Sequence, residues 1–312
     1  MTEPRMFDAE RLERLINDAR GGEPDSRRLL HGRGRCYPGC EQINVDFFNP
    51  VAVVTLYAES AEAHLTGIMK ELKCLQPSPL EALVVQRRYL AGAPAEWLVG
   101  VMPESWYARR GSLRFALTLD GQQNPGFFLD MEPGRRWLEA LAPGKRVLNL
   151  FAYTCAFSVV AVAAGAERVV NVDMSKQALA RGRDNHHING LDKRRSEFLP
   201  EQILKSWSRI RRRGPYDVVI LDPPSFQRGS FVATRDYAKL VRRLPELLPA
   251  GGDVLACLNA PELDTGFLQQ VFAEHCPQAR LLERLPGSED FPDAEPERQL
   301  KLLHFTYPGV SG

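Results

Sequence analysis

The chain has 312 residues, of which 44% are hydrophobic and 25% are charged, and its 40 Lys and Arg residues nearly balance 39 Asp and Glu residues to give a net charge of +1. These values are typical of a globular protein and argue against disordered, fibrous and membrane classes. The length favours two domains, because one domain usually holds roughly 100 to 200 residues. With so little net charge, any attraction for nucleic acid must come from local basic patches.

No segment approaches the roughly 18 apolar residues of a membrane span, and the N-terminus lacks the basic-then-apolar layout of a signal peptide. We therefore expect a cytoplasmic protein with no membrane partner. The six cysteines are few and irregularly spaced, which is typical of core thiols in a reducing compartment. Cys36 and Cys40 could begin a zinc site, but no second ligand pair follows at a suitable spacing, so we expect no metal.

Residues 1–111 predict a small α+β domain on the substrate side of the protein. Its expected elements are a helix at 7–20, a strand at 51–57, a helix at 60–72, and strands at 83–89 and 97–102. Ser60 can cap the second helix, whose leucines and isoleucine recur at helical spacing. A turn-rich stretch that begins His31-Gly-Arg-Gly-Arg35 lies between the first helix and the first strand.

Residues 112–312 predict a second domain that opens with a hairpin, whose first strand spans 113–119. From Arg146 onward, compact apolar runs alternate with helical stretches, as in a mostly parallel sheet covered by helices. The expected strands are 147–151, 168–173, 196–199, 216–221, 253–258, 279–285 and 300–306. The last one follows a Pro-rich loop and is expected to be an antiparallel edge strand. The fold class is therefore α/β, with a Rossmann-like seven-stranded sheet.

The turn after the first strand of this sheet is the first candidate for a ligand site. In open α/β sheets the ligand crevice lies beyond the carboxyl ends of the strands, and here the turn leads into a helix N-terminus that suits a carboxylate such as that of methionine. The turn lacks a Gly-x-Gly-x-x-Gly motif, which counts against a nicotinamide dehydrogenase. The expected lining residues are Asn149, Phe151, Ala152, Tyr153 and Thr154.

Two further positions complete the expected cofactor site. Asp173 ends the second strand, where a carboxylate can accept both hydroxyls of a ribose, and Met174 follows it. The alternative for Asp173 is a cap for the helix that starts at Ser175. After the third strand, Glu201 or Gln202 could accept a hydrogen bond from an adenine amine, and we prefer Gln202. The alternative for both is a solvated first helical turn.

Asp222-Pro-Pro-Ser-Phe226 follows the fourth strand. Two consecutive prolines fix φ and remove two backbone donors, so Pro223 and Pro224 leave carbonyls exposed to a base amine. Phe226 can stack on the base, and Asp222 can orient the base, draw off a proton and border the cofactor. A structural turn is the alternative. The position after the fourth strand, with a ribose-binding acid after the second, favours a catalytic cleft.

Several motifs together resemble the bacterial 23S rRNA large-subunit methyltransferases, which modify C5 of cytosine or N7 of guanine. They are Asn149-Leu-Phe-Ala-Tyr-Thr-Cys155, Val172-Asp-Met-Ser175, Asn185-His-His-Ile-Asn-Gly-Leu191, Leu221-Asp-Pro-Pro-Ser-Phe226, Gln123-Asn-Pro-Gly-Phe-Phe-Leu-Asp130 and His31-Gly-Arg-Gly34. The resemblance implies a class I methyltransferase fold, S-adenosylmethionine as cofactor, ribosomal RNA as partner and a homodimer. The family also includes an N-terminal RNA-recognition module for which we find no matching segment.

The chain departs from this family at two positions. Many relatives have glycine at the position of Cys155, so we expect the cysteine to narrow the cofactor turn. Cytosine-C5 enzymes carry a cysteine after the fifth strand, because a thiolate must add to C6 of the base, and Asn259 stands there in this chain. Cys257 lies about 6.6 Å along the strand and is interpreted as a core residue. Direct transfer to a nitrogen fits Asn259, a catalytic candidate, better.

Basic clusters leave the RNA hypothesis open. Arg209, Arg211–Arg213 and Lys193–Arg195 could contact phosphates, or could be solvated helix ends. The same two interpretations apply to the N-terminal arginines at positions 33, 35, 87 and 88. A methyltransferase that acts on a protein or a small molecule, and a non-catalytic S-adenosylmethionine-binding protein, remain alternatives.

Overall fold

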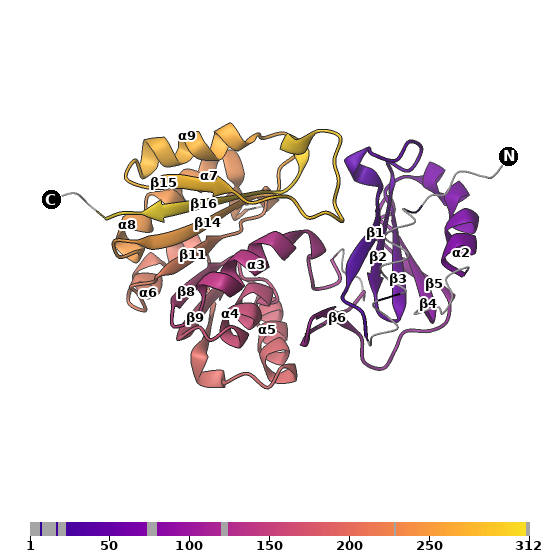
Figure 1. Cartoon of the computed structure of the whole chain (residues 1–312), viewed down its shortest axis with the longest axis horizontal. Coiled ribbons are helices and arrows are strands. Elements are labelled where there is room, and N and C mark those ends of the chain that lie inside the picture. The colour runs from indigo at the N-terminus through magenta and orange to yellow at the C-terminus, as the bar shows by residue number, and fades with distance from the viewer. Residues whose placement is uncertain are drawn as a thin grey trace. The chain divides into compact units, whose positions relative to one another are not determined.

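The computed structural model describes residues 7, 17, 23–73, 80–119, 124–227 and 229–309, so the helix predicted at 7–20 lies almost entirely outside the described residues. The chain divides into two compact units (Figure 1). Unit 1 comprises Met1–Leu129 and Glu289–Glu295, and unit 2 comprises Asp130–Ser288 and Pro296–Gly312. In the described residues, no helix combines the length and hydropathy that a bilayer crossing requires.

Unit 1 is built on a five-stranded sheet in the order β1-β2-β3-β4-β5. The strands are β1 (Arg27–His31), β2 (Ile43–Phe48), β3 (Val51–Leu56), β4 (Ala82–Arg87) and β5 (Ala95–Val99). β3 and β4 are parallel, and the other neighbours are antiparallel. Helix α2 (Leu65–Lys73) buries Leu65, Ile68 and Leu72 against the sheet, as its helical spacing predicts.

Apart from the helix at 7–20, the predicted elements of this unit are confirmed with shifted ends, and three strands, β1, β2 and β6 (Tyr107–Arg110), were missed. The first turns of the helix predicted at 60–72 are a 3-10 helix (Glu59–His64). β1 and β2 lie on either side of the turn-rich stretch that begins at His31. β2 does alternate Ile43, Val45 and Phe47 with polar Asn44 and Asp46, but all of these side chains are buried. The sequence did not predict this strand, because Asn44 and Asp46 are polar and only the structure shows that they are buried together with their partners.

A short hairpin of β6 (Tyr107–Arg110) and β7 (Leu113–Ala116) follows, turning at Gly111 with φ +54°. The structure groups this hairpin with unit 1. The division predicted from the sequence, 1–111 and 112–312, instead runs through it. The segment Glu289–Glu295, distant in sequence, also belongs to unit 1.

Unit 2 contains a seven-stranded sheet in the order β10-β9-β8-β11-β14-β16-β15. The strands are β8 (Arg146–Leu150), β9 (Arg168–Asp173), β10 (Ser196–Pro200), β11 (Val218–Leu221), β14 (Gly252–Leu258), β15 (Arg280–Arg284) and β16 (Lys301–Tyr307). All pairs from β10 to β14 are parallel, whereas β16 is antiparallel to both neighbours. The predicted seven-stranded α/β fold is confirmed.

The position predicted for the last strand was wrong. β16 is antiparallel, as expected, but it lies inside the sheet between β14 and β15. Its side chains are buried on both faces, including Leu302, Leu303 and Phe305. β15 is the edge strand, and its Leu281 and Leu282 are exposed. β16 carries Leu302, Leu303, Phe305 and Tyr307 and therefore gains more from burial than β15, so it takes the inner place.

Helices cover both faces of this sheet. Their bounds are α3 (Glu132–Leu141), α4 (Ala156–Ala163), α5 (Lys176–Ile188), α6 (Trp207–Arg211), α7 (Ala233–Val241), α8 (Leu244–Leu247) and α9 (Thr265–His275). α3 and α4 share one hydrophobic core with Val147, while α6 to α9 share the other with Leu148 and Leu150. α5 lies against α4, β9 and β10 (Figure 1). Successive side chains along β8 point to opposite faces of the sheet and thus pack into two separate cores.

The strand order reverses at β8, which pairs with β9 on one side and with β11 on the other. In open α/β sheets, ligands bind beyond the carboxyl ends of the strands at such a reversal, so we expect the ligand crevice there. The residues that follow β8 and β11 border this crevice.

Candidate cofactor and methyl-transfer site

The turn between β8 and α4 has an unusual backbone. Phe151, Tyr153 and Cys155 have φ values of +59°, +47° and +61°. Side chains disfavour this left-handed region, and such conformations persist where the surroundings impose them, often at ligand sites. Left-handed residues in a turn direct backbone N–H groups into a concavity that binds anions. In this turn the N–H groups of Ala152, Tyr153 and Cys155 already donate within the protein. The first N–H groups of α4, which follow directly, have no partner within the helix, and they suit a carboxylate group of a ligand.

Asp173, at the end of β9, holds this turn in place. Its Oδ2 accepts a hydrogen bond from the Tyr153 N–H and its Oδ1 accepts one from the Ser175 N–H, both at 2.8 Å. The cap of α5 is Ser175, whose hydroxyl accepts from the Ala178 N–H, so Asp173 is not the cap. Burial raises the pKa of Asp173, and the two N–H groups oppose that rise. Each carboxylate oxygen keeps acceptor capacity for a ribose hydroxyl.

Helix α5 packs against the turn between β8 and α4. Asn185 donates a hydrogen bond to the Thr154 carbonyl at 3.0 Å. The Cys155 thiol is fully buried beside Leu179, and a Cβ on Gly182 would lie 2.4 Å from its Sγ. The thiol thus occupies space that Gly182 leaves open inside the protein. This contact accounts for a cysteine at a position where the backbone favours glycine.

Asn149, expected to line the cofactor site, is instead only 1% exposed in a buried polar network. Its Nδ2 donates to Asn171 Oδ1 at 3.0 Å, and Asn171 donates to Ser158 Oγ at 2.9 Å. His186 Nε2 lies 3.0 Å from Ser158 Oγ, and its Nδ1 lies 2.8 Å from the Gly182 carbonyl. That carbonyl can only accept, so Nδ1 carries the proton and Nε2 accepts from the Ser158 hydroxyl. Burial lowers the pKa of His186 and keeps the ring neutral.

The other expected lining residues differ in exposure. Phe151 and Tyr153 are partly buried, Ala152 and Thr154 are buried, and Met174 is 49% exposed after β9. The Phe151 ring packs edge-on against Phe231, with centroids 5.2 Å apart. The structure therefore leaves the backbone of the turn, together with the side chains of Tyr153 and Met174, on the solvent side.

Of the two candidates after β10, Glu201 is already engaged. Its carboxylate accepts a hydrogen bond from the Ser206 hydroxyl at 3.0 Å and forms an ion pair with Arg209. Gln202 has no side-chain hydrogen bond to any of the residues that the structure describes, and it lies directly before a short 3-10 helix (Ile203–Lys205). The Gln202 amide therefore remains available for a ligand.

Asp222 lies at the carboxyl end of β11 with an altered pKa. Burial raises its pKa to about 7, the negative charge of Asp130 adds to the rise, and Arg135 opposes it. Arg135, on α3, is only 2% exposed and pairs with Glu132 at 3.2 Å. A carboxyl group with a pKa near neutrality is suited to proton transfer. Asp130 and Arg135 were not predicted from the sequence, because both precede the first strand of the sheet.

The residues after Asp222 form a small hairpin. Pro223 is buried and Pro224 is half-buried, and β12 (Phe226–Gln227) then pairs with β13 (Phe231–Val232). Phe231 is buried against Phe151, whereas Phe226 is 67% exposed. One ring of the hairpin thus anchors it to the cofactor turn, and the other presents an aromatic face to solvent.

The carboxyl end of β14 carries the remaining candidates. Cys257 is fully buried, and burial, followed by the charges of Asp222 and Asp130, raises the pKa of its thiol well above the ordinary value. Asn259 is exposed one residue beyond the strand. Tyr237, a residue not predicted from the sequence, donates a hydrogen bond to the Cys257 carbonyl at 3.1 Å and lies 3.5 Å from the Leu221 carbonyl. Its hydroxyl therefore ties the ends of β11 and β14 together.

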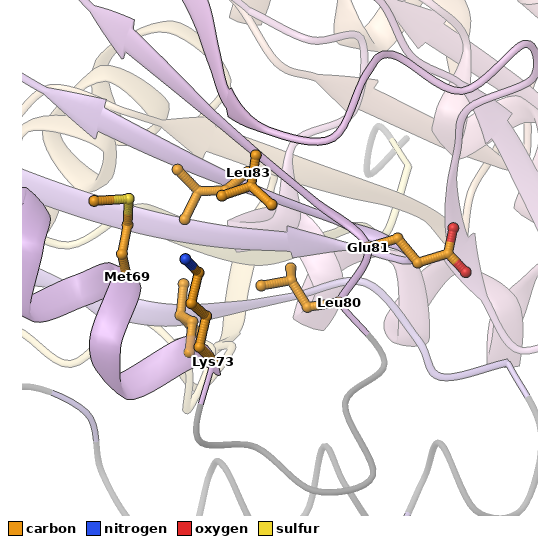
Figure 2. Close-up of a pocket in the computed structure, with 7 residues that line it drawn as sticks. Met69, Lys73, Leu80, Glu81 and Leu83 are labelled. Carbon is orange, nitrogen blue, oxygen red and sulfur yellow. The ribbon is translucent and has the colours of Figure 1, made fainter.

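A separate pocket of about 220 Å³ lies in unit 1 (Figure 2). Met69 and Lys73 of α2 face Leu83 of β4 across it, and the Glu81 carboxylate points away. Its apolar lining offers no pair of groups for acid–base chemistry. Across the described ranges, no group of three or more His, Cys, Asp or Glu residues is arranged to hold a metal ion.

The strand order, the anion-binding turn and the acid after the second strand define a class I methyltransferase fold with a site for S-adenosylmethionine. The chain belongs to the S-adenosylmethionine-dependent methyltransferase family, whose profile matches residues 27–306. The resemblance inferred from the sequence motifs is thereby confirmed, as is the cofactor.

Named relatives and solved structures agree with this assignment. The chain is 30% identical to ribosomal RNA large subunit methyltransferase I of Photobacterium profundum, over 85% of this chain and 69% of that protein. It is 29% identical to the protein of the same name from Klebsiella pneumoniae, and spans 64% of its length. A crystal structure of a candidate methyltransferase complexed with SAH superposes with a TM-score of 0.84, at 24% identity, over 95% of this chain and 79% of that one.

Proposed function

We propose that this protein transfers a methyl group to a base nitrogen in ribosomal RNA. The observation that carries the proposal is Asp222, a carboxyl group with a pKa of about 7 beside a rigid Pro-Pro segment and the exposed ring of Phe226. The names of the relatives, which are ribosomal RNA methyltransferases, support RNA as the acceptor.

The residues around the crevice fit S-adenosylmethionine, which when bound supplies an electrophilic methyl group. The N–H groups at the N-terminus of α4, directly after the 151–154 turn, would hold its amino-acid carboxylate. Asp173 would accept hydrogen bonds from its ribose hydroxyls, and the Gln202 side-chain oxygen would accept one from its adenine amine. Met174 is exposed beside Asp173 and would cover one face of the nucleoside.

The acceptor side is built from the ends of β11 and β14. Phe226 would stack on the base, a contact worth about 1 to 3 kcal/mol. The carbonyls of Pro223 and Pro224 would accept hydrogen bonds from the exocyclic amine of the base. The Asn259 side chain would hydrogen-bond to the edge of the base and orient it. Where the reacting nitrogen carries a proton, as an amine or imino nitrogen does and N7 of guanine does not, ionised Asp222 would accept that proton as the methyl group transfers. Cys257 supports nitrogen over C5 as the acceptor, because a buried thiol with a raised pKa is a poor nucleophile.

Calorimetric titration with S-adenosylhomocysteine tests the cofactor half of the proposal. We expect micromolar affinity that Asp173→Ala abolishes, since the variant loses both the ribose acceptor and the clamp on the Tyr153 N–H. Asp192→Ala, which removes a solvent-side carboxylate paired with Arg194, is the matched control and should bind normally. Binding of NAD in place of the homocysteine compound would contradict the proposal.

Methylation assays with tritiated cofactor test the acceptor half. We expect label in ribosomal RNA stripped of its modifications, and none in ribosomal protein or in a metabolite extract. Label in protein or small molecules would favour the other acceptor classes. Cofactor binding with no label in any fraction would favour a non-catalytic binding protein.

Three finer expectations accompany this proposal. Unit 1 would lie on the substrate side, the protein would act in the cytoplasm where ribosomes assemble, and it would form a homodimer. Light scattering of the purified protein measures the last of these directly. A monomer at micromolar concentration would contradict it.

A further inference from the structure

The His31-Gly-Arg-Gly-Arg35 motif is not part of the methyl-transfer site, and its loop in unit 1 is tightly built. A Cβ on Gly32 would lie 1.7 Å from the Cys40 carbonyl oxygen, and one on Gly34 would lie 1.8 Å from the Pro292 carbonyl oxygen. Only glycine fits at either position. The loop backbone is therefore fixed, and the arginines between and after the glycines are presented from a rigid support.

Sheet topology brings two further residues to this loop. β1 and β3 are both antiparallel to β2, and β3 is parallel to β4, so the carboxyl ends of β1, β3 and β4 share one end of the sheet. Tyr57 directly follows β3, and Arg88 directly follows β4 and donates its backbone N–H to the Leu56 carbonyl. Arg33 follows β1. These three side chains meet although they are distant in sequence.

The contact among them is specific. The Arg33 guanidinium carbon lies 4.5 Å from the centroid of the Tyr57 ring, and that of Arg88 lies 5.6 Å from the same centroid. The Tyr57 ring is held from behind, because Asn44 can accept from both its hydroxyl and Arg28 Nη1 at 3.1 Å. Asn44 is 2% exposed. A buried network thus fixes the ring that positions both cations.

The arginines in and next to this motif differ in whether they pair with a carboxylate. Arg35 pairs with Glu295 at 2.8 Å, and Arg28 makes a two-pronged ion pair with Asp46. Arg33 is exposed and pairs with no carboxylate in the part of the chain that the structure describes. The Arg33 and Arg88 guanidinium groups share one neutral ring, so two positive charges lie close together at this end of the sheet. Guanidinium forks match phosphate oxygens in shape and charge.

We propose that Arg33 and Arg88, arranged on Tyr57, form a binding site for the phosphate backbone of the RNA substrate. This site rests on the proposed function and extends it, because it gives unit 1 a direct part in RNA binding. The contact is independent of base sequence and supplies affinity and orientation, while the crevice in unit 2 selects the base.

Fluorescence anisotropy with labelled single-stranded polyuridylate, titrated at several KCl concentrations, tests the site in the full-length protein. Arg33→Gln and Arg88→Gln should each weaken binding about threefold and reduce the slope of log K against log salt by about 0.7. Arg33→Lys should retain the slope, since it retains the charge. Arg35→Gln is the matched control from the same loop and should bind as the wild type does, because Glu295 already neutralises that arginine.

Two results would overturn the site, and they are distinguishable. If Arg33→Gln matches Arg35→Gln in affinity and slope while the wild type binds RNA, the phosphate site is wrong and the RNA proposal stands. If the wild-type protein binds S-adenosylhomocysteine but no RNA, the RNA acceptor fails and the site fails with it. An unchanged thermal unfolding profile shows that each variant is folded in both units, since binding of S-adenosylhomocysteine reports on unit 2 alone. Free inorganic phosphate at equal ionic strength should compete weakly, since it lacks the polymer's other contacts.

Discussion

Asp222 acquires its chemistry from its surroundings. Its carboxyl group lies at the end of a buried strand, near the charge of Asp130 and with Arg135 on the adjoining helix. The ordinary pKa of an aspartate would leave it fully ionised at neutral pH and a weak base. Burial and a like charge bring the pKa to about 7, so the group can both accept and release a proton under physiological conditions.

The pH dependence of activity follows from this pKa. Only the ionised form of Asp222 can accept a proton, so kcat/KM should rise about tenfold per pH unit below about 7 and level off above it. Asp222→Asn should lower the rate by about 10² to 10⁴ and abolish that limb. Initial rates of methyl transfer across this range measure both. A variant that keeps the wild-type profile would show that another group accepts the proton.

The same shift predicts an effect on stability. Because the folded-state pKa of Asp222 is raised, the folded chain binds more protons than the unfolded chain between the two pKa values, and the free energy of unfolding falls as pH rises toward 7. Asp222→Asn should therefore be more stable than the wild type at pH 8 and lose that advantage near pH 4. Urea unfolding at the two pH values tests the sign. A variant destabilised at pH 8 would contradict it.

At the scale of elements, helix α5 and the β8–α4 turn are fitted to each other. Gly182→Ala would place a Cβ 2.4 Å from Cys155 Sγ and should destabilise the protein by about 1 to 3 kcal/mol. It should also weaken binding of S-adenosylhomocysteine, because the turn must shift. Cys155→Gly in the same chain should restore most of both losses. Additive effects in this double-mutant cycle would show that the two residues do not share the strain.

The polar network beneath the turn joins β8, β9, α4 and α5. Asn171→Leu would leave the buried Asn149 amide without its acceptor, at a cost of about 1 to 3 kcal/mol, while the Ser158 hydroxyl would keep only its hydrogen bond to His186. Unfolding in urea measures the loss. Asn189→Leu, one residue beyond the end of α5, removes a hydrogen bond from a less buried side chain and serves as the comparison. Equal losses would show that the network has no special part in stability.

The whole molecule has two compact units, and the residues proposed for the cofactor all belong to unit 2. Saturating S-adenosylhomocysteine, at about 100 times its dissociation constant, should stabilise the unit that binds it by about 2.7 kcal/mol. In differential scanning calorimetry of the full chain, we expect one transition to move to higher temperature and another to stay. A single transition that moves as a whole would show that the units unfold together.

The resemblance of motifs and the alternation of apolar runs were sufficient to predict the methyltransferase fold and the cofactor. Seven strands are detectable in the sequence because central parallel strands are continuous apolar runs, and Asp173 and Asp222 are detectable because each directly follows such a run. β2 and the place of β16 were not predictable in this way. Both depend on which faces are covered by other parts of the chain, and burial by distant segments leaves no local pattern.

The sequence by itself determined which candidate site residues follow each strand, because the end of a strand is marked by the end of a local apolar run. Only the tertiary structure decided that Asn149 is part of the core, that Asp130 raises the pKa of Asp222, and that Arg33 meets Arg88 on Tyr57. In each case the decisive partner lies far along the chain, and its distance and burial exist only after folding. Electrostatic and hydrogen-bonding effects depend steeply on both quantities, so the sequence alone could not supply them.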